Sequence, residues 1–304
     1  MNAIASSSSR ARNWPELSFV FLCLVSIVFW LRDLTALLKL AVSDERYTHL
    51  FLVLPLSALL IFLQRNSVRL APRRRTIWAA GFLIFSVVLA ELARIHVPNS
   101  GLPSDVRLTV SVFALVVWWI GSFVLCFGLQ AFQALSFPLL FLLWMVPLPS
   151  LVLDVWVGWW QRGSAISAEM LFRLIREPAT LSGMVLSLPG LDLEVAPECS
   201  SIRSSLILIV TTMALAQILL RSPWRKVAVI ALAIPLSIAK NGLRIFVLGW
   251  LATHGDPDIF STRLHTQGGV VFLSVAFAIV FVLAWILRRD ERKCEVARMW
   301  TTVG

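Results

Sequence analysis

Apolar residues in this chain form long, nearly uninterrupted segments. They do not recur only every three or four residues, as they do on one face of an amphipathic helix. A helix needs ~20 largely apolar residues to cross ~30 Å of hydrocarbon. Eight segments approach this length, at about residues 16–31, 50–64, 77–93, 108–127, 131–149, 201–220, 227–251 and 268–287. The pattern predicts an all-α polytopic membrane protein with eight transmembrane helices.

Lys and Arg residues are concentrated before the first apolar segment, in residues 65–75 and 221–226, and after the last segment. The other connections balance acids against bases, whereas cytoplasmic loops carry an excess of Lys and Arg. We therefore expect both termini to be cytoplasmic. The expected division is a tail over residues 1–14, one transmembrane domain over 15–290 and a second tail over 291–304. The first apolar segment lacks a small-x-small cleavage pattern, so we expect it to be an uncleaved span.

Composition supports a membrane protein and argues against the soluble classes. The 304 residues are 58% hydrophobic and 14% charged, whereas soluble domains are about 25% charged. Thirteen Trp residues against one Tyr fit interfacial aromatic belts. The net charge of +10 is explained by the basic loops, so we do not expect nucleic acid as a partner.

The longest outer connection runs from about residue 151 to residue 198. Its first part, residues 154–176, mixes Trp and aliphatic residues with charged ones, which is typical of interfacial helices. Residues 184–188 and 191–195 alternate around Pro189-Gly190. This pattern predicts a short β-hairpin before span six.

Cys199 follows that hairpin and directly precedes the apolar segment 201–220. Free amides and partial positive charge at a helix N-terminus favour a thiolate, the nucleophilic form of cysteine. Four dispersed Cys residues form no disulfide framework. The thiol is therefore either a nucleophile or an inert buried side chain.

Arg244 lies ~27 Å above Lys226 along the seventh span, close to the outer boundary. Lys240 and Asn241 lie one turn below it, so the three polar side chains share one helix face. Intramembrane charges usually face a polar cavity. The alternative is that Arg244 extends to the lipid headgroups.

His265 lies three residues before the last apolar segment, at the same outer boundary. Histidine exchanges protons near neutral pH, as acyl transfer by a thiol requires. His254 on the same connection competes for this role, and either ring can simply be solvated. If the three groups meet, Cys199 attacks a peptide carbonyl, His265 moves protons and Arg244 stabilises the thiolate or the oxyanion.

Several motifs resemble those of the exosortase/archaeosortase family across roughly residues 15 to 290. The matching stretches are Tyr47-Thr48-His49, Phe137-Pro138-Leu139-Leu140-Phe141, Val146-Pro147-Leu148-Pro149, Cys199-Ser200-Ser201-Ile202-Arg203-Ser204, Asn241-Gly242-Leu243-Arg244-Ile245, and His265 with Gly269. The family motif has Gly where Ser201 stands, so backbone flexibility beside the thiol differs here. The resemblance implies a cysteine transpeptidase whose catalytic residues are Cys199, Arg244 and His265.

The resemblance also implies the substrate and the location. The substrates are exported proteins that end in a Pro-Glu-Pro-like motif, a transmembrane helix and a basic cluster. The enzyme is then multi-pass in the bacterial inner membrane, with its site facing the periplasm and a link to exopolysaccharide or biofilm matrix. The acceptor is an amine, a lipid or a glycan, or water.

Six further residues are candidate substrate contacts at such a site. They are Arg203 and Arg263 for the acidic motif, and Lys240, Asn241, Tyr47 and His49 as cavity lining. Arg203 can equally be a headgroup contact at the helix start. Tyr47 and His49 can equally be interfacial anchors.

Two other functions remain open from the sequence. The chain can be a non-catalytic component of polysaccharide synthesis or export, or a transporter that uses the polar stripe of span seven. It has no Gly-x-Ser-x-Gly and no His-Glu-x-x-His motif, which argues against serine and zinc proteases. We expect no metal and no cofactor, since the four Cys and four His have no ligand spacing.

Overall fold

The computed structural model describes the backbone of residues 2–65, 77–97, 101, 103–195, 202–255 and 263–303. Within these ranges, the side chains of residues 2–13, 77, 104, 263–268 and 294–303 are not described. The chain forms two compact units, Met1–Ser150 and Leu151–Gly304. Each unit is described by itself.

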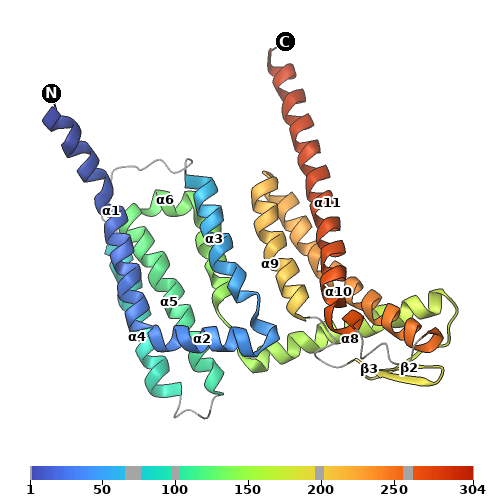
Figure 1. Ribbon diagram of the computed structural model, residues 1–304. Coiled ribbons are helices and arrows are strands. Elements are labelled where there is room, and N and C mark those ends of the chain that lie inside the picture. Colours follow the sequence, from blue (N-terminus) through green and yellow to red (C-terminus); the bar gives the residue numbers. More distant parts are fainter. Residues whose placement is uncertain are drawn as a thin grey trace. The chain divides into compact units, whose positions relative to one another are not determined.

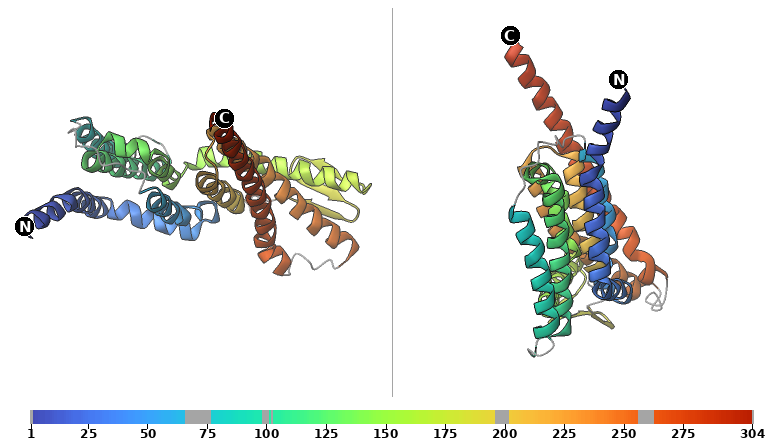
Figure 2. Two further views of the ribbon diagram at one scale, coloured as in Figure 1. Left: turned by 90° about the horizontal axis from the view of Figure 1, so that it is seen from above. Right: turned by 90° about the vertical axis from the view of Figure 1, so that its left-hand side faces the viewer.

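The first unit is built on three long helices that run side by side, α1, α4 and α5 (Figures 1 and 2). Its helices up to residue 127 are α1 (Asn2–Phe29), α2 (Leu31–Ser43), η1 (Glu45–Tyr47), α3 (Leu50–Gln64), α4 (Ile77–His96) and α5 (Ser104–Phe127). At Trp30 the chain turns by 76° from α1 into α2. The predicted first span therefore ends near Phe29, and a second helix follows it.

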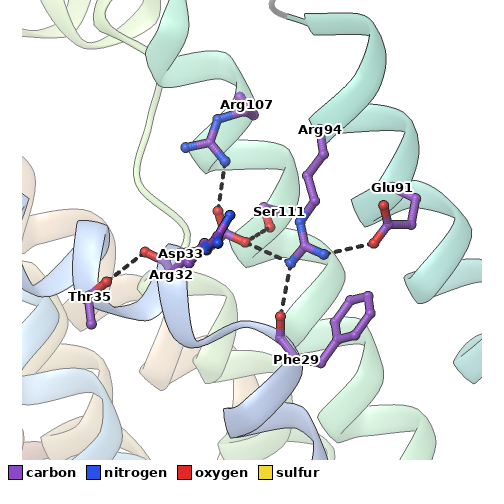
Figure 3. A network of polar contacts seen from close by, with 8 residues as sticks. All are labelled: Phe29, Arg32, Asp33, Thr35, Glu91, Arg94, Arg107 and Ser111. Atoms are coloured by element: carbon purple, nitrogen blue, oxygen red, sulfur yellow. Dashed lines mark hydrogen bonds and ion pairs between the residues drawn. The ribbon is translucent and has the colours of Figure 1, made fainter.

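Asp33 ties α2 to α4 and α5 (Figure 3). The carboxylate is 1% exposed. It accepts hydrogen bonds from Arg107 Nη1 at 2.9 Å, Arg94 Nη2 at 3.0 Å and Ser111 Oγ at 2.8 Å. A buried carboxylate is tolerated when partners of this kind satisfy its oxygens. This network fixes the bend after α1 within the unit.

The predicted fifth span, residues 131–149, is not one helix, so that prediction was wrong. The segment forms α6 (Leu129–Ala134), α7 (Ser136–Phe141) and the 3₁₀ turn η4 (Leu142–Met145). Leu135 leaves helical geometry at φ −110°, ψ 21°. Pro147 and Pro149 each lack an amide hydrogen, which prevents a regular helix beyond η4.

Side chains from neighbouring elements hold this broken segment in place. Ser57 Oγ donates to the carbonyl of Pro138 at 2.8 Å, and Thr109 Oγ1 donates to that of Pro147 at 2.8 Å. Tyr47 Oη donates to the Leu148 carbonyl at 2.8 Å. Carbonyls left without helical partners are thus satisfied inside the unit.

The second unit combines four helices with a small sheet (Figure 1). Its elements are α8 (Ser150–Leu174), β1 (Thr180–Ser182), β2 (Val185–Leu188), β3 (Leu191–Glu194), α9 (Ile202–Leu219), α10 (Pro223–His254) and α11 (Arg263–Val303). The first residue of α8 closes the first unit. Helices α9, α10 and α11 pack on one another through Leu208, Val229 and Val280.

The sheet confirms the predicted hairpin and adds one strand to it. Strands β2 and β3 pair antiparallel across Pro189-Gly190, with Leu188 opposite Leu191. Gly190 has φ +76°, a region that glycine occupies without strain. The unpredicted strand β1 pairs with β2 on its other edge. Leu186 of the sheet packs with Phe172 of α8 and Ile245 of α10.

Six helices among the described residues are long and apolar enough to cross a membrane, or eight if two bent helix pairs each form one span. The prediction of a largely helical polytopic membrane protein is confirmed. The predicted spans 50–64, 77–93, 108–127, 201–220, 227–251 and 268–287 each fall largely on one helix. Helix α11 continues to Val303, so residues 291–303 of the predicted tail are helical. The three-part domain division stays a prediction.

Asp33→Ala should destabilise the protein by about 3 kcal/mol, because it leaves Arg94 and Arg107 without their shared carboxylate. The measurement is the apparent melting temperature of the purified protein in detergent. Glu91→Gln is the control: Glu91 also pairs with Arg94 but is 44% exposed, so its loss should cost less than about 0.5 kcal/mol. Equal melting of Asp33→Ala and wild type would contradict the role given to Asp33.

Candidate functional site

One face of α10 carries four polar side chains within the long apolar middle part of the helix. Ser237, Lys240, Asn241 and Arg244 follow one another at helical spacing. The first three are buried and Arg244 is half-buried. The predicted polar stripe is therefore present and faces the interior of the unit.

Lys240 connects this stripe to the beginning of α9. Its Nζ donates a hydrogen bond to Ser204 Oγ, and Ser204 is the third residue of α9. Lys240 is 6% exposed and Ser204 is 9% exposed. A buried ammonium beside a helix N-terminus adds positive charge to an end that already favours anions.

Asn241 is fully buried, and neither its Oδ1 nor its Nδ2 has a hydrogen-bond partner among the described residues. Buried amides are almost always hydrogen-bonded, because an unsatisfied one costs about 1–3 kcal/mol. The side chain therefore retains the capacity to bind a peptide group, a water molecule or a residue outside the described ranges.

Close packing of α8 against α10 determines which way the polar face of α10 points. A Cβ on Gly242 would lie 2.5 Å from Ser167 Cβ and Oγ and 3.1 Å from the Ala168 amide nitrogen. Further down, Trp160 Nε1 donates to Ser237 Oγ at 2.7 Å. The two contacts fix the rotation of α10, which turns Lys240 toward α9.

The residue at which the described chain ends before Cys199 is held in place by hydrogen bonds. Val195 is buried, its amide donates to the Met184 carbonyl at 2.9 Å, and its carbonyl accepts from Gln161 Nε2. The described chain stops at Val195 and resumes at Ile202. Cys199 itself lies outside the described residues.

The predicted site residues near α11 are described only in part. Arg263 and His265 lie in the first turn of α11, and their side chains are outside the described part of the chain. Arg203 is exposed in the first turn of α9.

The competing histidine, His254, is held by other side chains at the end of α10. Its Nε2 lies 3.3 Å from Glu177 Oε1, its Nδ1 lies 2.9 Å from Thr253 Oγ1, and its ring stacks on Trp250. These contacts hold the His254 ring at the C-terminal end of α10.

Tyr47 and His49 belong to the first unit and are buried there, at 5% and 7% exposure. Tyr47 supports the proline-rich segment after η4 through Leu148. His49 packs edge-on against Trp144, and its Nδ1 has no hydrogen-bond partner among the described residues. Burial of both rings does not fit interfacial anchoring.

Three residues of the site escaped the sequence argument: Ser204, Ser237 and Gly242. Ser204 and Gly242 stand inside the quoted motifs, and Ser237 continues the stripe one turn below Lys240. Helical spacing indicated the stripe, but pairing across helices is decided only by packing. Among the residues that the structure describes, no group of three His, Cys, Asp or Glu side chains could hold a metal ion.

Comparison with known proteins gives one match. A family model described as transmembrane exosortase matches residues 41–282, about four-fifths of the chain. No curated protein and no solved structure matches. The matched range contains Tyr47, Cys199, Arg244 and His265.

Gly242→Ala should destabilise the second unit by about 1–3 kcal/mol, because the new methyl group overlaps Ser167. The measurement is the apparent melting temperature in detergent. Gly158→Ala on α8 is the matched control, since a Cβ there meets nothing within 4 Å. The double variant Ser167→Gly with Gly242→Ala should recover most of the loss, and failure to do so would exclude Ser167 as the contact.

Proposed function

Because this chain belongs to the transmembrane exosortase family, we propose that it is a cysteine transpeptidase for exported proteins with C-terminal sorting signals. Cys199 is the nucleophile, Arg244 stabilises negative charge and His265 moves protons. The enzyme is a multi-pass protein of the bacterial inner membrane with cytoplasmic termini and a periplasmic active site.

The contact between Lys240 and Ser204 carries this proposal. It joins the polar face of α10 to the first turn of α9, the helix that begins three residues after Cys199. Three residues extend at most ~11 Å. Chain length therefore keeps the thiol within reach of the positive end of α9 and of the α10 stripe.

Direction of the helices supports a role for His265 at the same end. Helix α9 begins at Ile202, α10 returns toward His254, and α11 begins at Arg263. Since the three helices pack together in alternating directions, the start of α9 and the start of α11 belong to one end of the bundle.

Acyl transfer at this site requires that the Cys199 thiolate forms in an apolar environment. The Cys199 thiolate attacks the scissile carbonyl, and positive charge from Arg244 favours the thiolate. When the tetrahedral intermediate collapses, the C–N bond breaks and His265 gives its proton to the leaving amine. The acyl group stays on sulfur as a thioester until an amine, a lipid, a glycan or water attacks it and the thiolate leaves.

Lys240 and Asn241 bind the substrate in this proposal. Ser204 is the hydrogen-bond partner of Lys240 among the described residues, so the ammonium retains donors for an acidic side chain. This requirement fits a Pro-Glu-Pro-like sorting motif. Arg203 and Arg263, in the first turns of α9 and α11, are further candidates for that carboxylate. Tyr47 and His49 of the first unit remain candidate substrate contacts.

Cys199→Ala should abolish processing of a co-expressed exported protein that carries a sorting tail. The measurement is the intact mass of that protein, which keeps its tail in the variant and loses it with the wild-type enzyme. Cys126→Ala is the control, because Cys126 is a buried thiol of the first unit. Full processing by Cys199→Ala would leave a non-catalytic function in polysaccharide synthesis or export as the explanation.

Arg244→Gln should slow alkylation of Cys199 by iodoacetamide at pH 7 by about tenfold, because loss of an adjacent cation lowers the thiolate fraction. The rate is measured in a background in which Cys23, Cys126 and Cys294 are Ala. Arg244→Lys keeps the charge and should retain most of the rate. An unchanged rate in Arg244→Gln with lost processing would contradict the thiolate role and assign Arg244 to the oxyanion.

A further inference from the structure

Strand β3 is an edge strand of the small sheet. The strand order is β1-β2-β3, so β3 pairs with β2 on one side (Figure 1). Among the described residues, no strand pairs with its other side. Its sequence, Leu191-Asp192-Leu193-Glu194, alternates aliphatic and acidic residues. An edge strand presents a row of N–H and C=O groups to which another extended chain can hydrogen-bond.

The hydrogen bond from the Val195 amide to the Met184 carbonyl shows which backbone groups of β3 point outward. In an antiparallel pair, alternate residues direct both their N–H and their C=O toward the partner strand. Val195 and every second residue before it therefore face β2. The backbone groups of Asp192 and Glu194 face the free edge, which thus offers donors and acceptors at two alternate positions.

The carboxylates of Asp192 and Glu194 lie on the exposed face of the sheet. Both residues are exposed, whereas Leu193 between them is partly buried and packs against a core cluster that includes Phe172 and Ile245. In the described part of the chain, neither carboxylate has a hydrogen bond or an ion pair. This edge is therefore locally acidic in a chain whose net charge is +10.

The two acidic side chains select among the chains that are able to pair with this edge. Residues directly opposite each other in an antiparallel pair share one face, where opposite charges stabilise the pair and like charges destabilise it. A second copy of β3 would bring Asp192 and Glu194 next to the same two acids. A segment with Lys or Arg at alternate positions places a cation beside each carboxylate. The charges therefore favour a basic extended segment over a second copy of this chain.

We propose that the free edge of β3 binds an extended polypeptide segment with Lys or Arg at alternate positions, as an added antiparallel strand. Backbone hydrogen bonds to Asp192 and Glu194 provide affinity, and their carboxylates select basic residues. Val195, the buried residue after β3, lies four residues before Cys199, and four residues extend at most ~14 Å. The segment is thus bound next to the chain that leads to this thiol, and its binding does not depend on the cysteine chemistry.

Two isomeric peptides test strand addition on the wild-type protein. The parent probe is fluorescein-labelled Thr-Lys-Thr-Lys-Thr, and its binding to the full chain in a non-ionic detergent is measured by fluorescence anisotropy. N-methylation of both Lys amides removes the donors that face β3 and should weaken binding at least about tenfold. N-methylation of the second and third Thr, whose amides face away from β3, should change binding less than about twofold. Equal binding of the two isomers would overturn strand addition.

Asp192→Lys tests the preference for basic residues and the direction of the added strand. It should weaken binding of the parent probe about fivefold, because a like-charge pair replaces an opposite-charge pair. A probe with Glu in place of its second Lys should recover most of this loss, whereas Glu in place of the first Lys should not, since Asp192 is opposite the later residue in an antiparallel pair.

The matched control is Asp290→Lys, which makes the same change in net charge at an exposed residue of α11 outside the sheet. It should bind the parent probe like wild type. Equal binding of the parent probe by Asp192→Lys and Asp290→Lys would overturn the charge preference.

Probe binding and tail processing are separate measurements. Cys199→Ala should bind the parent probe like wild type while it leaves a tailed reporter intact. No binding to wild type up to ~1 mM probe would overturn strand addition and leave the transpeptidase proposal standing. A wild-type protein that binds the probe but leaves every tailed reporter intact would do the reverse.

Discussion

The close approach of α8 to α10 at Gly242 is the constraint on which the orientation of the polar face of α10 depends. Two helix backbones come this near only where one of them lacks a Cβ, and here the missing atom would overlap Ser167. The contact fixes the rotation of α10. Because Lys240 and Asn241 directly precede Gly242 on the helix, the same rotation directs the ammonium toward Ser204 and buries the amide.

Two clusters of buried polar groups, one in each unit, differ in how completely they are hydrogen-bonded. In the first, Asp33 is surrounded by Arg94, Arg107 and Ser111, and its oxygens are satisfied (Figure 3). In the second, Asn241 is as deeply buried, but its amide has no hydrogen-bond partner among the described residues. A satisfied network stabilises a fold, whereas retained capacity is a cost that a binding partner can offset.

A membrane setting makes the contrast sharper. Polar groups in hydrocarbon cannot form hydrogen bonds with water. Charged residues within a membrane therefore usually have a functional role.

Much of the helix inventory could be predicted, because a run of apolar residues long enough to cross a membrane leaves the backbone few alternatives to a helix. The prediction of one helix was wrong at residues 131–149. This segment is apolar and long enough to cross a membrane, but Leu135 and two prolines interrupt the helix. The sequence pattern also failed to predict strand β1, which is three residues long and has too few positions to show alternation. The hairpin was predictable because Pro189-Gly190 fixes its turn locally.

The sequence by itself determined the membrane class, most of the spans, the polar stripe on α10 and the motifs that indicate the family, because each depends on composition or on spacing along one helix. The tertiary structure alone decided that Lys240 contacts Ser204, that α8 packs against α10 at Gly242, and that Tyr47 supports the chain at Leu148. These features join residues distant in the chain, and their partners depend on how helices rotate and pack, which no local pattern encodes.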